Sequence, residues 1–489
     1  MNRILVVGSG GREDALGWAL ARAGAQQLWF YPGNAGTLRW GTNISRYGMP
    51  AGKSSEKEEV EAIVKWAQAH GIDLVVVGPE AYLAAGLADR MRAAGIPVFG
   101  PGVAGARIEA SKAWAKEFMA RHGIPTAPHV TFTQAEAGAA RRYVEQSGRP
   151  LVIKADGLAA GKGVRVTASR QEALEALEAL LVEGTLGEAG RTVVIEERME
   201  GREVSLLAIT DGEALLVLPE AQDHKRVGEG DTGPNTGGMG AYSPVPFFNK
   251  EVREEAIRRI LLPAVQGLAG EGIDYRGVLY AGLMLTGDGP KVVEFNCRFG
   301  DPETQVILPR LSVDWPSLLG AAAQGRLGEY LRELSSTGAT ACADATAASV
   351  ANAATAESPA AATGGTVLRA RSTFSQVWEL RPTTGAALGV VLASRGYPGK
   401  YETGFPISGL DVVAALPGIE VFHAGTRVDP SRPGEVLTAG GRVLNVVGLG
   451  DTLSEARSRA YEGAAAIRFD NVYYRRDIGH QALEESRDQ

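Results

Sequence analysis

The chain has 489 residues, of which 45% are hydrophobic and 22% charged, and its formal net charge at pH 7 is −7. This length exceeds what one hydrophobic core supports, so we expect about two to four domains, and the acidic balance without a basic tract argues against a nucleic-acid-binding protein. Two cysteines give no disulfide framework. Because the sequence lacks a signal-peptide core and any apolar run near the roughly 20 residues that cross a bilayer, we expect a cytoplasmic protein without a membrane partner.

The N-terminal part, up to about residue 101, alternates short apolar runs with helical patterns. We expect strands at residues 4–7, 28–31, 74–77 and 97–99, and helices at residues 13–23, 55–70 and 82–94. Because strands alternate with helices, the pattern predicts right-handed crossovers and a doubly wound parallel sheet. Ligands of such sheets bind beyond the carboxyl ends of the strands, where segments 8–12, 32–36 and 78–80 fall.

The rest of the chain changes to an α+β pattern. We expect a helix at 111–121, a strand at 151–153, an antiparallel meander of 192–197, 203–210 and 214–219, and a hairpin of 278–285 with 291–295. The last part, about 378–447, is rich in glycine, valine and threonine and is followed by a helical pattern at 452–467.

One stretch, residues 335–365, consists almost entirely of alanine, threonine, serine and glycine. With hardly a large apolar side chain, it buries too little surface to offset the entropy lost on ordering. We expect a mobile insertion here, and a short alanine-rich helix is the alternative.

A glycine-rich turn, Gly-Ser-Gly-Gly-Arg-Glu at residues 8–13, follows the first predicted strand and opens a helix. Backbone N–H groups at a helix N-terminus bind anions, and Arg12 adds a guanidinium. The third glycine of a dinucleotide fingerprint is replaced by Glu13, and the second strand ends without an acidic residue for a ribose. The turn therefore favours a smaller sugar phosphate over NAD, with a plain tight turn as the bland alternative.

A second glycine-rich loop follows the predicted strand at 151–153 and contains Lys154, Gly157, Gly161, Lys162 and Gly163. A buried lysine needs an anion beside it, and glycines allow backbone amides to close over phosphates. The spacing is not that of a Walker A loop. This loop indicates phosphate binding, and a solvated loop remains the alternative.

Polar residues alternate along the predicted strand that ends near residue 296. The period of two places Glu294, Asn296 and Arg298 on one side and Cys297 on the other, where it needs no role. A carboxylate and an amide oxygen suit a hard cation such as Mg²⁺, and a neighbouring arginine stabilises charge on a transferring phosphoryl group. The alternative is an exposed charged face of an edge strand.

A long polar and glycine-rich run follows Gln-Asp-His-Lys-Arg at residues 222–226 and extends over residues 228–240. Its glycines are interspersed with acidic, hydroxyl and amide side chains, which is typical of a binding loop more than of a linker. A flexible surface loop is the alternative.

Together these segments closely resemble the phosphoribosylamine–glycine ligase family, also called the glycinamide ribonucleotide synthetases, within the ATP-grasp superfamily. Other ATP-grasp ligases share the lysine loop and the predicted metal strand. More specific to the family is the combination of segments 32–36, 154–163, 222–226, 233–240, 294–303, 395–399 and 474–479. The resemblance covers nearly the whole chain apart from about residues 335–376.

The resemblance implies three parts: an N-terminal α/β substrate-binding domain at 1–101, an ATP-grasp domain at 102–327 with its inner lobe at about 123–192, and a small C-terminal α+β domain at 328–489 that carries the insertion. It implies a carbon–nitrogen ligase of de novo purine biosynthesis, expected to be a monomer. In this reaction the carboxylate of glycine attacks ATP to give glycyl phosphate. The amine of 5-phosphoribosylamine then displaces phosphate, so that glycinamide ribonucleotide, ADP and phosphate are formed.

The resemblance also implies roles for individual residues. The nucleotide would be contacted by Lys112, Lys154, Gly157, Gly161, Lys162, Gly163, Glu196, Glu197 and Glu203. Mg²⁺ or Mn²⁺ would be held by Glu294 and Asn296. Glycine and the reacting phosphate would lie among Asp223, Lys225 and Arg298. Phosphoribosylamine would be surrounded by Gly10, Gly11, Arg12, Asn34, Glu80 and Asp301.

The chain departs from the family pattern at positions where the family usually has histidine and proline but this chain has Asp14 and Tyr82. Both positions are expected on the phosphoribosylamine side. Many ATP-grasp enzymes take a second metal-binding acid from the neighbouring strand, and residues 280–284 offer none. Open alternatives are an ATP-grasp ligase for another acid or amine, a nucleotide-binding sensor without turnover, and a dehydrogenase.

Overall fold

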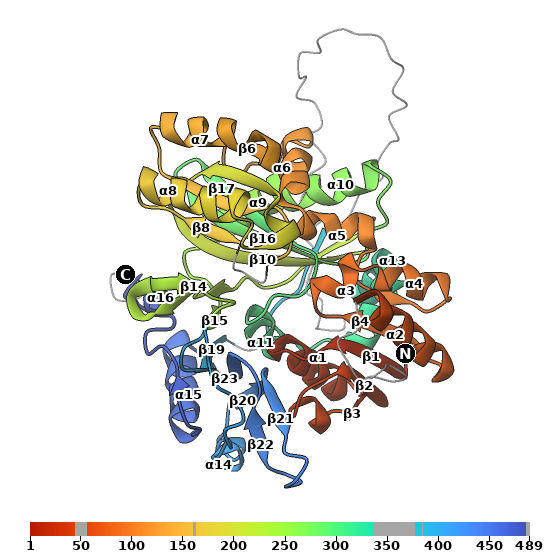
Figure 1. The fold of residues 1–489 in the computed structure, drawn as a ribbon. Helices are drawn as coiled ribbons and strands as arrows, with labels where there is room; N and C mark the ends of the chain where they lie inside the picture. The colour runs from red at the N-terminus through yellow and green to blue at the C-terminus, as the bar shows by residue number, and fades with distance from the viewer. Residues whose placement is uncertain (45–55, 160–162, 337–376, 384, 486–489) are drawn as a thin grey trace.

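The computed structural model describes residues 1–44, 56–159, 163–336, 377–383 and 385–485 (Figure 1). The predicted insertion at 335–376 therefore lies almost entirely outside the described residues, as do Gly161 and Lys162 of the second glycine-rich loop. Among the described helices, none combines the length and apolar character that a membrane crossing requires.

The N-terminal part is a five-stranded parallel sheet of strand order β3-β2-β1-β4-β5. Its strands are β1 (Arg3–Gly8), β2 (Gln27–Pro32), β3 (Thr42–Asn43), β4 (Leu74–Val77) and β5 (Val98–Phe99). Its helices are α1 (Gly11–Arg22), α2 (Glu56–Ala69), α3 (Glu80–Ala84) and α4 (Leu87–Ala93). Alternate residues of β1 belong to two different buried clusters, so both faces of the sheet are covered, as the predicted doubly wound sheet requires.

Two details of this sheet differ from the sequence-based expectation. The strand β3 was not predicted, because two residues carry no periodicity. The helix predicted at 82–94 is two helices, since Gly86 at φ +90° interrupts the helical path and forms the N-cap of α4. A left-handed residue ends a right-handed helix, and glycine adopts that conformation without steric cost.

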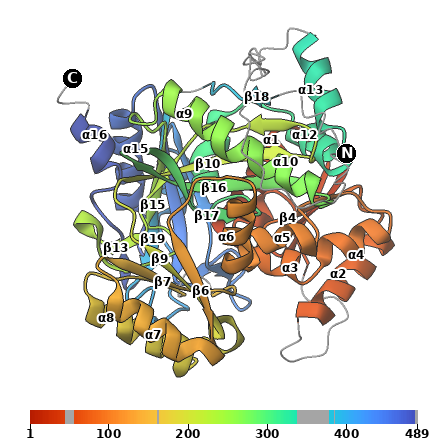
Figure 2. The same ribbon diagram turned by 90° about the horizontal axis from the view of Figure 1, so that it is seen from above.

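The middle part of the chain consists of two lobes on different sheets. The inner lobe has the strand order β6-β9-β7-β8, and α7 and α8 cover its outer face (Figures 1 and 2). Its elements are β6 (His129–Thr133), α7 (Ala137–Gln146), β7 (Leu151–Ala155), β8 (Val164–Val166), α8 (Arg170–Leu177) and β9 (Thr192–Glu197).

The second lobe is a five-stranded sheet of order β17-β16-β10-β11-β18. Its strands are β10 (Arg202–Thr210), β11 (Leu215–Val217), β16 (Gly277–Thr286), β17 (Gly289–Asn296) and β18 (Val377–Glu379). The predicted hairpin of β16 and β17 is confirmed, and β10 pairs with β11 as expected. The predicted meander is wrong at its first step, because the chain crosses from one lobe to the other between β9 and β10, which pair with different strands.

Helices fill the space around this sheet. Those that contact β17 are α5 (Val103–Ala110), α6 (Lys112–Arg121) and α9 (Lys250–Ala256). The remaining helices of this part are α10 (Leu262–Gly270), α11 (Glu303–Ile307), α12 (Trp315–Ala323) and α13 (Leu327–Ser336). Because α12 contacts both β5 and β16, it joins the N-terminal sheet to the sheet of the second lobe.

The C-terminal part is built on the sheet β12-β15-β19-β23-β20, to which β24 adds by pairing with β19. Its strands are β12 (Gln222–Asp223), β15 (Gly240–Ser243), β19 (Ala386–Ser394), β20 (Ile419–His423), β23 (Arg442–Gly450) and β24 (Val472–Tyr473). The predicted helix at 452–467 is α15 (Leu453–Ala466), which packs on β23 and β19. Two strands of this sheet, β12 and β15, come from the middle of the chain and cross the division expected at residue 328.

The smaller elements of the C-terminal half complete the fold. They are the hairpins β13 (Arg226–Gly228) with β14 (Thr232–Asn235) and β21 (Thr426–Val428) with β22 (Val436–Thr438), and the helices α14 (Leu410–Ala414) and α16 (His480–Glu485). The β13–β14 hairpin forms most of the polar glycine-rich run that the sequence predicts to be a binding loop.

Candidate active site

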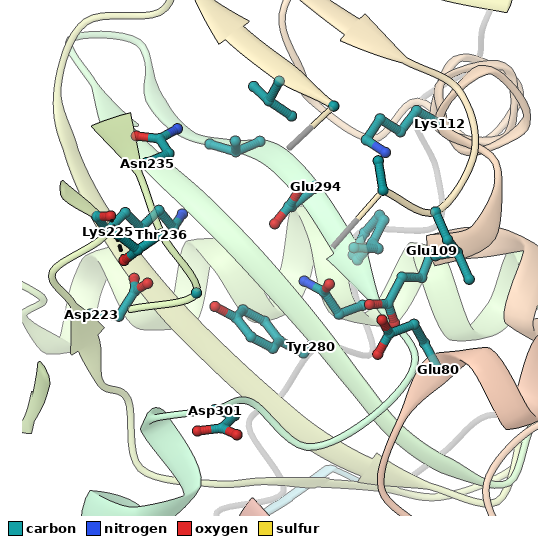
Figure 3. A pocket seen from close by; sticks show the side chains of 18 of the residues that line it. Glu80, Glu109, Lys112, Asp223, Lys225, Asn235, Thr236, Tyr280, Glu294 and Asp301 are labelled. Carbon is teal, nitrogen blue, oxygen red and sulfur yellow. Dashed lines mark hydrogen bonds between the residues drawn. The ribbon is translucent and has the colours of Figure 1, made fainter. Parts of the chain in front are cut away.

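Two adjoining cavities, of about 700 Å³ and about 890 Å³, open between the lobes. They share wall residues, among them Lys154, Asp223 and Glu294. Figure 3 shows Asp223 and Lys225 on one side of a pocket and Glu80 on the other, with Glu294 between them. The first cavity also has residues of the N-terminal and C-terminal parts in its wall, so all three parts of the fold meet there.

Most of the predicted site residues lie in these walls. The first cavity is lined by Arg12, Glu80, Lys112, Lys154, Gly163, Glu196, Asp223, Lys225, Glu294, Asn296, Arg298 and Asp301. The second adds Glu197 and Glu203. Among the predicted residues that the structure describes, those that line neither cavity are Gly10, Gly11, Asn34 and Gly157.

The predicted metal ligands Glu294 and Asn296 lie on β17 and face the first cavity. Their cross-strand partners on β16 are Gly282 and Tyr280, and the missing side chain of Gly282 leaves room beside Glu294. Burial opposes the charge of Glu294, but the neighbouring lysines outweigh it and lower the pKa of this carboxyl. A carboxylate and an amide oxygen that face one polar space fit a hard divalent cation.

A buried carboxylate, Glu196, lies between two lysines. Its oxygens are 2.8 Å from the Lys154 ammonium and 3.0 Å from the ammonium of Lys116. Burial lowers the pKa of Lys116 to about 8. Lys116 was missed from the sequence, although it follows Lys112 by one helical turn and therefore shares its helix face.

The loop after β7 is fastened to the start of α6. The Asp156 carboxylate accepts hydrogen bonds from Ser111 Oγ at 3.0 Å and from the Ala113 N–H at 2.8 Å. Lys112 Nζ donates to the Gly157 carbonyl at 3.4 Å. Burial lowers the pKa of Lys112, and its ammonium points into the cavity in Figure 3.

The predicted glycine-binding pair, Asp223 and Lys225, belongs to a cluster of charges. Lys225 forms an ion pair with Glu203. Burial opposes the charge of Lys225, but Glu203 and Asp223 outweigh it and hold the pKa of this lysine well above its usual value. Burial raises the pKa of Asp223 to about 7, and Glu303 and other nearby carboxylates add to the shift against the opposing charge of Lys225. A carboxyl that titrates near neutrality is typical of functional sites.

Arg298 is clamped between acids from two other elements. Its guanidinium lies 2.9 Å from Glu109 and 3.4 Å from Glu80, and donates to Asn296 Oδ1 at 3.1 Å. Glu109, at the end of α5, was missed because nothing local marks a partner so distant in sequence. It also accepts the N–H of Cys297, which is buried and lines neither cavity.

Of the residues predicted to surround phosphoribosylamine, Arg12, Glu80 and Asp301 line the first cavity. Arg442 of β23 reaches this wall and lies 3.3 Å from the Asp301 carboxylate. Asn34 lines neither cavity: its Nδ2 donates to the carbonyls of Ser9 at 2.9 Å and His423 at 2.8 Å. Its side chain therefore holds the first glycine-rich turn against the C-terminal part.

The two departures from the family pattern also lie away from the cavity wall. Asp14 is completely buried and accepts hydrogen bonds from Arg39 at 2.6 Å, from Trp40 at 2.7 Å and from the His423 N–H at 2.7 Å. Tyr82 donates to Glu59 at 2.7 Å on the N-terminal part. Asp14 thus joins the N-terminal and C-terminal parts and does not line the space expected for phosphoribosylamine.

Other wall residues had no role predicted from the sequence, although Tyr397 lies in the family-specific segment 395–399. Tyr280 donates to Glu303 at 2.5 Å beside Asp223, and the Tyr397 hydroxyl accepts the Gly237 N–H at 2.9 Å. Both pairs join segments far apart in the chain. Their partners become visible only when the sheets are assembled.

Three family models match most of the chain. Residues 2–109, 110–304 and 387–481 match the family models of the N domain, the ATP-grasp (A) domain and the C domain of phosphoribosylglycinamide synthetase. The three matches follow the order of the three parts described above.

Similar proteins agree with this match. Phosphoribosylamine–glycine ligases of Yersinia pestis and of a Nostoc species are 43% and 46% identical, over 98% of this chain and 99% of each relative. The crystal structure of the phosphoribosylamine–glycine ligase of Thermotoga maritima has a TM-score of 0.72 at 33% identity, covering 97% of this chain and all of that one. Biotin carboxylase of Campylobacter jejuni, at 14% identity and a TM-score of 0.64, shares the fold alone. The chain belongs to the phosphoribosylglycinamide synthetase family of ATP-grasp ligases.

Proposed function

We propose that the two cavities carry out the family reaction, the ATP-dependent joining of glycine to 5-phosphoribosylamine in purine biosynthesis, through glycyl phosphate. The observation that carries this proposal is the convergence on one space of Glu294 and Asn296, of the lysines 112 and 154, and of Arg12 with Glu80 from the N-terminal part. An oxygen pair, a set of cations and a substrate-binding wall are what a ligase with two anionic reactants requires.

In the first step a carboxylate oxygen of glycine attacks the γ-phosphorus of ATP, and the bond to ADP breaks. Both reactants are anions, so positive charge must offset their repulsion in the transition state. We assign this role to Lys112, Lys154 and Arg298. The clamp of Glu80 and Glu109 around Arg298 supports the assignment, because a preorganised guanidinium needs no reorientation during the reaction.

Asp223 and Lys225 are assigned to glycine itself. The Asp223 carboxylate is in the cavity wall and suits the ammonium group of glycine, whose charge would favour the ionised form of Asp223. In the second step the amine of phosphoribosylamine attacks the acyl carbon, phosphate leaves and the amine loses a proton. Exclusion of water by the closed lobes would protect the acyl phosphate from hydrolysis.

ATP-grasp enzymes use a divalent metal ion, and we propose that it is Mg²⁺ bound by Glu294 and Asn296, with Mn²⁺ as a substitute. The ion, when bound, neutralises phosphate charge and orients the γ-phosphate. Two oxygen ligands leave the remaining coordination positions for phosphate oxygens and water, which is the usual arrangement for Mg²⁺.

The test is ADP release by the purified chain with Mg²⁺-ATP and freshly generated phosphoribosylamine, with and without glycine. ADP and glycinamide ribonucleotide formed only when all three substrates are present would support the proposal. ADP release that needs a different acid or amine would move the chain to another ligase activity. ATP binding without turnover would instead support a sensor.

A further inference from the structure

The segment that carries Asp223 and Lys225 also carries a histidine on its other side. His224 lies between them, and extended backbone sends neighbouring side chains to opposite faces. The His224 side chain is only 1% exposed and lines the second cavity but not the first, whereas Asp223 and Lys225 line both. Its backbone is held to β15 by hydrogen bonds with the Gly240 carbonyl at 2.9 Å and the Met239 N–H at 2.8 Å.

The His224 ring is held by the C-terminal segment. Its Nε2 accepts the Gly479 N–H at 3.0 Å, which fixes the neutral ring as the tautomer with its proton on Nδ1. That Nδ1 lies 3.5 Å from the Asp231 carboxylate, and the ring packs 5.5 Å from the ring of His480. Both nitrogens of the ring are therefore used in contacts that join two distant parts of the chain.

Asp231, seven residues after His224, also contacts the C-terminal segment. One oxygen accepts Arg475 Nη1 at 2.8 Å and the other accepts Gln481 Nε2 at 3.0 Å. The Arg475 side chain is completely buried and also grips Asp477 with two hydrogen bonds of 2.8 and 2.7 Å. Such bidentate, charge-assisted bonds fix geometry as well as adding energy.

Residues 226–231, which we call the catalytic-side loop, also contact the C-terminal segment through their backbone atoms. The Tyr473 hydroxyl donates to the Val227 carbonyl at 2.8 Å, and the Gly230 N–H donates to Asp477 at 2.8 Å. Residues 473–481, which we call the C-terminal clamp, thus hold the loop at several points. This gives a structural role to the family-specific segment 474–479.

The spacing of His224, Asp231 and His480 resembles that of a metal site, since one ligand atom from each lies within 4.8 Å of the others. A cation there would have to displace the Arg475 guanidinium from Asp231 and the Gly479 N–H from His224. The positive charge of Arg475, which is already paired with the Asp231 carboxylate, would repel a metal ion at this place. The cluster is therefore a polar joint between the clamp and the loop.

We propose that His224 is a positioning residue for the ligation: through Gly479 and Asp231 it fixes the orientation of Asp223 and Lys225 in the cavity. This inference rests on the roles proposed for those two residues. Without the buried acceptor His224 Nε2, the Gly479 N–H has no hydrogen-bond partner. The backbone must then shift so that this N–H finds another acceptor. A shift of about 1 Å in groups that orient a substrate costs on the order of 100-fold in rate.

The test compares His224→Gln with His224→Asn in the full chain. The Gln amide extends to the position of the ring Nε2 and can accept the Gly479 N–H, whereas the Asn amide is too short to reach it. We expect His224→Gln to keep kcat within a few-fold of wild type and His224→Asn to lower it on the order of 10- to 100-fold, with a raised KM for glycine. The dissociation constant of ATP should change by less than about twofold in both.

The control is His122→Gln at the far end of α6, which should leave kcat and all KM values unchanged. Equal kcat values for the Gln and Asn variants would overturn the role of His224, as would a loss of ATP binding in parallel with kcat, which is the mark of general unfolding. A wild-type chain that releases no ADP in response to glycine would instead overturn the proposed function together with this role. Wild-type turnover therefore separates the two failures.

Discussion

The Lys116 ammonium lies 3.0 Å from the Glu196 carboxylate, with both side chains almost completely buried. Because Glu196 also pairs with Lys154, the two lysines together exceed the charge of the acid and leave a net positive charge where we propose that ATP binds. We expect Lys116→Met to raise the KM for ATP on the order of tenfold. The exposed Lys250→Met provides the control, and an unchanged KM for ATP in Lys116→Met would contradict the charge balance.

The same pair predicts a pH dependence. Burial lowers the pKa of Lys116 to about 8, so its charge is present below that pH and is lost as the pH rises through it. The KM for ATP should therefore rise above pH 8 in the wild type. In Lys116→Met this rise should be smaller, since the variant has no Lys116 proton to lose. A pH profile of the KM for ATP between pH 6.5 and 9.5 measures both.

Removal of the Glu294 carboxylate should abolish turnover. Glu294→Ala takes away one of the two oxygen ligands assigned to the metal, and we expect kcat to fall by at least about 100-fold. Titration of activity with Mg²⁺ checks the cause, because the variant should need far more metal for what activity remains. Near-normal activity with the wild-type Mg²⁺ dependence would rule out this role, and the exposed Asp288→Asn on the same hairpin is the matched control.

The buried carboxyl of Asp223 should make the folded chain less stable at neutral pH than at acidic pH. Its pKa is raised by burial from 3.8 to about 7, so the folded state resists ionisation. This penalty is absent below pH 3.8, grows as the pH rises and is complete above pH 7. Asp223→Asn should therefore raise Tm more at pH 8 than at pH 5 while lowering kcat. Thermal unfolding at the two pH values measures the difference, and an equal gain at both would show that ionisation is not its source.

Asp14 should matter for stability and less for catalysis. Asp14→Ala leaves the Trp40 and His423 N–H groups without their buried acceptor, and we expect a loss of about 1–3 kcal/mol in the free energy of unfolding. The KM for ATP should stay within about twofold of wild type, because Asp14 is outside the cavity wall. Chemical denaturation measures the loss. The exposed Asp470→Ala is the control, and a large change in the KM for ATP would show that the domain contact acts on the active site.

The sequence alone predicted those parts of the fold and of the candidate site that depend on residues close together in the chain. Strand alternation and glycine-rich turns predicted the N-terminal sheet, the β16–β17 hairpin and the side of β17 that carries Glu294. These features depend on residues a few positions apart, so a single sequence contains them. The comparisons establish the family on which the residue assignments depend.

The other residues of the candidate site could not be predicted, because they come together only through contacts between segments that are distant in the chain. The acid beside Arg298 comes from α5, and the guanidinium beside Asp301 comes from β23. Neither element has a pattern that marks its partner. The same reason explains Asn34, whose motif predicted substrate contact but whose amide is occupied by the carbonyls of Ser9 and His423.

The pairing of β12 and β15 with β19 has a consequence for synthesis on the ribosome. The strands β12, which carries Asp223, and β15 come from the middle of the chain, but β15 lies beside β19, about 150 residues later. Until β19 has emerged, β12 and β15 form only a two-stranded ribbon, which has marginal stability in water. The N-terminal sheet can fold as it is translated, whereas the centre of the catalytic cavity must wait for the last domain.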